Sequence, residues 1–97
     1  MYLAKVIGRV VATTKDASLS GSKLLIITRL NELLQPQDVT LIAVDTVGAG
    51  KGETVIVTSG SASRFAGTLQ QSVVDATIVG IVDTVETDGG VSDVRHP

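Results

Sequence analysis

Residues 3–14, Leu-Ala-Lys-Val-Ile-Gly-Arg-Val-Val-Ala-Thr-Thr, contain the pattern that decides the fold class. Small and apolar residues such as Ala4 and Val6 occupy every second position, and charged residues such as Lys5 and Arg9 lie between them. A period of two is typical of a strand with one buried face. Gly8 lies mid-run, where a sharply bent strand benefits from having no side chain. The stretch therefore predicts a long, bent β-strand with small residues turned inward.

Four more strands are predicted outside this stretch. They lie at residues 23–30, 39–47, 53–59 and 73–85. All are rich in Val, Ile and Thr, which favour strands, and helical periodicity is nearly absent from the chain. Closing such apolar strands into a small barrel would remove their exposed edges. The sequence therefore predicts an all-β fold, a small β-barrel that occupies residues 1–86 as a single domain.

The segments between and after the strands give three further expectations. The Gly-rich residues 48–52 predict a turn that makes the third and fourth strands a hairpin. Residues 61–67 predict one short helix between the fourth and fifth strands, ended by Gly67. Residues 87–97 are polar, Gly-rich and unpatterned, so we expect a C-terminal tail that is mobile or acts as a short arm.

The predicted second strand is apolar on both faces. Leu24 and Ile26 lie on one face, and Leu25 and Ile27 lie on the other. A chain of 97 residues without Cys has neither the size nor the disulfides to hide so much apolar surface. We expect self-association through Leu25, Ile27 and Ile42, which we place facing away from the barrel interior.

Composition excludes several classes of function. Without Cys there is no disulfide, thiolate metal site or cysteine nucleophile, and the single histidine, His96, lies in the tail, which disfavours a Ser-His-Asp triad. A net charge of −2 and 2% aromatic residues disfavour nucleic-acid binding. No apolar run is long enough for a membrane helix, and the N-terminus has no targeting pattern. We therefore expect a mature cytosolic protein that is no enzyme and has no metal, cofactor, nucleic-acid or membrane partner.

The string Gly-Ala-Gly-Lys-Gly-Glu at residues 48–53 resembles a phosphate-binding loop at first sight. Such a loop requires Ser or Thr after the lysine and then a helix, whereas Lys51 precedes Gly52 and a predicted strand. Two interpretations remain open: a flexible hairpin loop, or a loop whose glycines allow copies to crowd at a subunit contact or symmetry axis. The candidate contact residues are Gly48, Ala49, Gly50, Gly52 and Glu53.

Three carboxylates, Asp45, Asp75 and Asp83, lie in or beside predicted strands. None has a histidine nearby in the sequence to support acid–base chemistry. Carboxylates at strand ends accept backbone N–H bonds or meet an Arg across an interface. We therefore assign them structural roles, with Arg64 and Asp83 as a candidate interface ion pair.

Several strings in combination resemble the EutN/CcmL family of bacterial microcompartment vertex proteins. They are GRVVAT at 8–13, GSKLL at 21–25, AVDTVGAGKGE at 43–53, GSASR at 60–64 and VDATIVGIVD at 74–83. The resemblance covers residues 2 to about 85 and implies an OB-like five-stranded barrel without active site or cofactor. It further implies a homopentamer that closes the vertices of a polyhedral shell tiled by hexameric shell proteins, in the bacterial cytoplasm. The alternative is an OB-like binding module for a small ligand or nucleic acid.

Overall fold

The computed structural model describes residues 1–13, 19, 23–60 and 75–95. The described residues form seven strands. These are β1 (Tyr2–Val10), β2 (Lys23–Leu30), β3 (Pro36–Asp45), β4 (Thr54–Ser59), β5 (Ala76–Ile81), β6 (Thr84–Thr87) and β7 (Gly90–Asp93). The short helix predicted at residues 61–67 lies outside the described residues.

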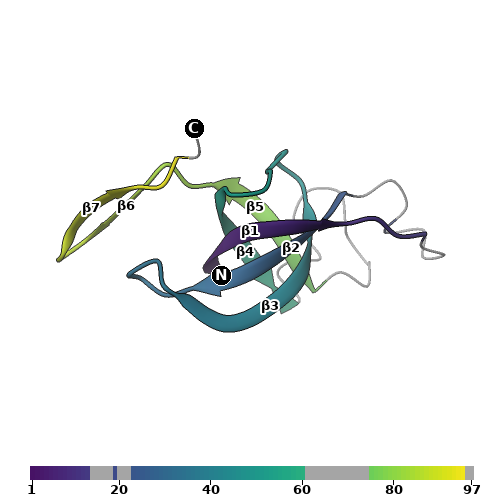
Figure 1. The fold of residues 1–97 in the computed structure, drawn as a ribbon, viewed down its shortest axis with the longest axis horizontal. Coiled ribbons are helices and arrows are strands. Elements are labelled where there is room, and N and C mark those ends of the chain that lie inside the picture. Colours follow the sequence, from purple (N-terminus) through teal and green to yellow (C-terminus); the bar gives the residue numbers. More distant parts are fainter. Residues whose placement is uncertain (14–18, 20–22, 61–74, 96–97) are drawn as a thin grey trace.

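Strands β1 to β5 close into a barrel in the order β1-β2-β3-β5-β4, and β4 pairs back onto β1 (Figure 1). Every neighbouring pair is antiparallel except β3 and β5, which run parallel. Because the barrel is closed, each of these five strands pairs with a neighbour on both sides and none is an edge strand. The predicted all-β, five-stranded barrel is confirmed.

The predicted hairpin between the third and fourth strands is wrong. β5 lies between β3 and β4: Val44 and Asp45 of β3 pair with Thr77 and Ile78 of β5, whose other edge pairs with β4. Glycines between two strands favour a hairpin on local grounds alone. Residues 46–53 instead connect β3 to β4 across β5, a strand from later in the chain that lies between them.

The core consists of the side chains that alternate into the barrel. Ala4 and Val6 of β1 are buried, as predicted. The assignment of faces on β2 is wrong, because Leu25 and Ile27 are buried, whereas Ile42 of β3 does face outward and is 56% exposed. A strand that is apolar on both faces carries no alternation to decide which face is inside. The outward apolar residues of β2 are Leu24 and Ile26, both half-buried.

Two β-bulges bend the barrel strands beside mid-strand glycines. On β1 the register shifts between Val6 and Gly8, and on β5 the corresponding shift lies next to Gly80. A Cβ at Gly8 would lie 3.4 Å from Ile26 Cδ1, and a Cβ at Gly80 would lie 3.5 Å from Ile56 Cδ1. Each glycine therefore leaves room for an isoleucine from the paired strand. The bend predicted at Gly8 is confirmed.

The last described residues form a hairpin that projects from the barrel (Figure 1). β6 and β7 pair with each other from Thr84–Asp93 to Thr87–Gly90, and Asp88 and Gly89 make the turn. We call residues 84–93 the arm. The unpatterned tail predicted after residue 86 begins inside β6, which ends at Thr87. The two strands of the arm are short and mostly polar, so they show no alternation of apolar and polar residues in the sequence.

Candidate functional site

The glycine-rich loop, residues 46–53, is tied to the barrel rather than free in solvent. Ala49 is 0% exposed and belongs to the hydrophobic core. The loop also bonds to β5, since Thr46 Oγ1 donates to the Ile78 carbonyl at 2.8 Å. On β1, the Gly52 N–H donates to the Val6 carbonyl at 2.8 Å. A loop with its middle residue in the core and bonds to two strands is a fixed part of the barrel.

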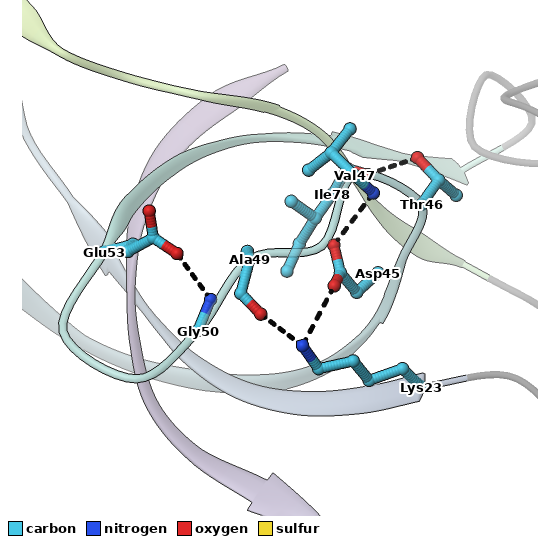
Figure 2. Close-up of polar contacts among 8 residues, drawn as sticks. All are labelled: Lys23, Asp45, Thr46, Val47, Ala49, Gly50, Glu53 and Ile78. Carbon is cyan, nitrogen blue, oxygen red and sulfur yellow. Dashed lines mark hydrogen bonds and ion pairs between the residues drawn. The ribbon is translucent and has the colours of Figure 1, made fainter.

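Lys23 and Asp45 form a latch across the base of this loop (Figure 2). Asp45 Oδ1 accepts the Val47 N–H at 3.1 Å, and Oδ2 lies 3.5 Å from Lys23 Nζ. The same ammonium donates to the Ala49 carbonyl. The Asp45 side chain is only 1% exposed, so its charge is compensated where water is excluded. The predicted backbone bond to Asp45 is confirmed, but its cationic partner is a lysine of the same chain.

Two of the glycine N–H groups of the loop already donate hydrogen bonds within the subunit. The Gly50 N–H donates to Glu53 Oε1 at 2.7 Å, and the Gly52 N–H is taken by Val6. A phosphate loop requires such N–H groups to converge on the ligand and a helix to follow. Here the strand β4 follows and Lys51 is exposed. The loop therefore lacks the geometry of a phosphate-binding loop.

Two of the loop glycines adopt backbone conformations that other residues rarely take. Gly48 has φ of 79° and Gly52 has φ of 93°, whereas Gly50 lies outside the positive-φ region. A Cβ at Gly50 would meet only Glu53 Oε1, at 3.5 Å. Gly48 and Gly52 are therefore required by the loop's own shape. Gly50 has room for a side chain within this subunit.

The predicted site residues fall into two groups. Gly48, Ala49, Gly50, Gly52 and Glu53 lie together in the latched loop, with Ala49 buried and Gly48 exposed. Asp83 is exposed just after β5, and Arg64 lies outside the described residues, so their ion pair stays a prediction. In the described segments no cluster of His, Cys or acidic residues could hold a metal ion. No helix in those same segments has the length and hydrophobicity to cross a membrane.

Lys23 and the hairpin within the arm are the features that sequence reasoning missed. Lys23 pairs in register with Asp45, so opposite charges face each other at the ends of two neighbouring strands. Only the register of β2 against β3 brings the two residues together. The arm has a signal of its own, because an Asp-Gly dipeptide between two short runs favours a hairpin; here it is Asp88-Gly89.

Apolar side chains also remain on the outside of the barrel. Ile7 is 43% exposed, Ile42 is 56% exposed and Ile81 is 39% exposed. They come from three strands, β1, β3 and β5. Such outward apolar residues are suited to contacts with other subunits.

Comparison with known proteins places the chain among shell components. Residues 1–83 match the family described as "Ethanolamine utilisation protein EutN/carboxysome". A "bacterial microcompartment shell vertex protein GrpN" from Rhodospirillum rubrum is 60% identical over 87 residues, which span 90% of this chain and 98% of GrpN.

Solved structures give the same result. The "GrpN pentameric microcompartment shell protein from Rhodospirillum rubrum" superposes with a TM-score of 0.81 at 60% identity, over 90% of this chain and 99% of that one. A structure titled "Carboxysome Subunit, CcmL" superposes with a TM-score of 0.91 at 43% identity, over 98% of this chain and all of that one. The similarity therefore extends across the whole barrel.

Proposed function

The chain belongs to the EutN/CcmL family, and from that premise we propose that it is a shell vertex protein of a bacterial microcompartment. Five copies form a ring that closes a vertex of the polyhedral shell in the bacterial cytoplasm. The observation that carries this proposal is the match over nearly the full length of both chains to a pentameric shell protein at 60% identity. The protein is structural and performs no catalysis.

The ring acts through its shape. A layer of six-fold tiles is flat, and a five-fold unit introduces the curvature that closes it. Hexameric shell proteins are the partners that such a ring meets at its rim. A closed barrel suits this task, because its strands pair internally and its outer residues, such as Ile42 and Ile81, remain for contacts with neighbours.

The glycine loop belongs near a contact between subunits or near the ring axis. The latch between Lys23 and Asp45 supports this placement, because it fixes the loop's shape before assembly. Gly50 leaves open space where another copy could approach closely. An ion pair between Arg64 and Asp83 across the interface remains part of the proposal.

A shell-closure experiment tests this function. Hexameric shell proteins from the same genome are expressed with and without this chain, and the products are imaged by electron microscopy. Closed polyhedra are expected only when the chain is present, and open sheets or tubes are expected without it. Equal closure in both preparations contradicts the vertex function. A mixture supplemented with an unrelated small β-barrel controls for added protein.

A further inference from the structure

The outward side of β2 and β3 carries no charged residue along three successive cross-strand pairs. The two strands are neighbours in the barrel (Figure 1), and Leu25 of β2 and Ala43 of β3 belong to its core. Residues that alternate with core residues along a strand point away from the core. The outward pairs are Leu24 with Val44, Ile26 with Ile42, and Thr28 with Thr40. We call these six residues the β2–β3 face.

The centre of the β2–β3 face is apolar and exposed. Ile42 is 56% exposed, and its register partner Ile26 is half-buried. Ile26 also reaches over β1, because a Cβ built on Gly8 would lie 3.4 Å from Ile26 Cδ1. Directly opposed residues of an antiparallel pair have adjacent side chains. The two isoleucines therefore form one apolar patch that continues over Gly8.

An uncharged, partly apolar sheet face is suited to an interface. The outward side of an antiparallel pair that stays in water is polar, whereas the central part of a protein interface is depleted of charge. Lys5 lies opposite Thr28 on β1, so a charged residue borders the face. On β4 and β5, the outward residues Thr58 and Thr77 are already buried within the subunit. The β2–β3 face has no such cover over Ile42.

We propose that the adjacent subunit of the ring, a second copy of this chain, packs on the β2–β3 face, an inference that rests on the proposed function. β2 and β3 are paired along both edges in the closed barrel, so the neighbour cannot add a strand to them. It must pack against their side chains instead. A ring is built from head-to-tail contacts, so the face meets a different surface of the neighbour and the contact repeats at every interface.

The chemistry of the face favours a copy of this chain over a hexameric shell protein. A surface kept for another preformed oligomer stays in water until the shell is built, which favours polar groups there. A contact within the ring is covered as soon as the ring forms, and permanent interfaces of this kind are more apolar. The similarity to a pentameric shell protein over 90% of this chain supports the presence of such copies. The pair Ile26–Ile42 therefore belongs to a contact within the ring.

Ile42→Glu and Leu33→Glu form a matched pair of variants. Leu33 is 60% exposed, about as much as Ile42, but it lies in the turn after β2, where its N–H donates to Asn31 Oδ1. Ile42→Glu is expected to raise the concentration at which the ring dissociates by about tenfold or more, because every interface would then bury an unpaired carboxylate. Leu33→Glu should leave that concentration unchanged. Light scattering along a dilution series measures both, and circular dichroism confirms that each subunit keeps its β-structure.

Thiol reactivity gives a second readout that introduces no charge into the interface, because the chain has no cysteine of its own. The thiol of Ile42→Cys should react with a maleimide about tenfold more slowly in the ring than in subunits dissociated by dilution, since burial restricts access to it. Glu32→Cys, at an exposed position outside the face, is the control. Its thiol should react at the same rate in both states.

The outcomes separate this inference from the proposed function. A wild-type protein that forms no ring overturns both. A wild-type ring that Ile42→Glu leaves unchanged, or that Ile42→Glu and Leu33→Glu weaken equally, overturns the placement of the contact while the ring stands. An Ile42→Cys thiol that reacts equally fast in both states does the same. An intact Ile42→Glu ring that no longer closes shells with hexameric shell proteins would assign the face to those partners and overturn its place within the ring.

Discussion

Asp45 stabilises the fold by holding the glycine loop to the barrel. Its carboxylate accepts the Val47 N–H and lies 3.5 Å from the ammonium of Lys23; the Asp45 side chain is 1% exposed and the Lys23 side chain 41%. Asp45→Ala is expected to lower the free energy of unfolding by about 1–3 kcal/mol, since it removes a buried acceptor and leaves the lysine without its partner. Asp45→Asn keeps an acceptor for Val47 and should cost less.

Urea denaturation at one fixed protein concentration measures these losses, because assembly would otherwise alter the midpoint. Glu32→Ala, at an exposed carboxylate, is the control and should leave the midpoint unchanged. An Asp45→Ala variant as stable as the wild type would show that the latch contributes nothing.

Arg95 controls the titration of Asp93 at the base of the arm. Hydrogen bonds from the Arg95 side chain, and then from its backbone N–H, lower the pKa of Asp93 from 3.8 to about 2. Because the folded pKa lies below the unfolded one, the contribution to stability is present above about pH 4 and is lost as the pH falls toward 2. NMR titration of Asp93 in Arg95→Ala should give a midpoint near the ordinary value. The same low midpoint in both proteins would refute this assignment.

The glycine loop provides a test at the scale of one element. Gly50→Val is expected to weaken the ring while the subunit keeps its β-structure, because Gly50 has space within its own subunit, whereas the proposed placement brings copies of the loop together there. Gly52→Val is the comparison: at φ of 93° it strains the loop itself and should destabilise the subunit. Ring dissociation on dilution and circular dichroism are measured for both. A Gly50→Val ring that dissociates as the wild type does would place the loop in solvent.

How far an element could be predicted depends on whether its signal is local. Alternation at the start of β1 involves neighbours in sequence and is confirmed at Ala4 and Val6. The register shift at Gly8 interrupts that alternation, because Arg9 then pairs with the buried Leu25. The pairing of β3 with β5 joins segments about thirty residues apart, as between Val44 and Thr77, so no local pattern could reveal it. On β2, apolar residues on both faces leave the register undetermined. The hairpin of the arm was missed because its strands are short and mostly polar, so they show no alternation of apolar and polar residues.

The candidate site follows the same rule. The five loop residues from Gly48 to Glu53 are contiguous, so their proximity needs no long-range information. Lys23 reaches Asp45 only because β2 and β3 pair in one register, which the sequence does not specify by itself. Arg64 and Asp83 lie on different segments, and the ion pair proposed for them would need a neighbouring subunit. Contacts between subunits are the part of the site that a single chain reveals least.

At the scale of the whole molecule, the proposed function depends on contacts made by the outer surface of the barrel rather than on a pocket. Its strands are closed among themselves, whereas Ile7, Ile42 and Ile81 face outward and the arm projects freely. A monomer would leave these features in water. In the proposed ring these features become contacts between subunits, so assembly and stability should rise together with protein concentration.

The mass of the purified full chain in solution tests this account most directly. Native mass spectrometry at micromolar concentration should show five copies of the 10.0 kDa chain as the dominant species. Light scattering on the same sample should agree. A well-folded species at 10.0 kDa, without higher assemblies at the same concentration, would contradict the account.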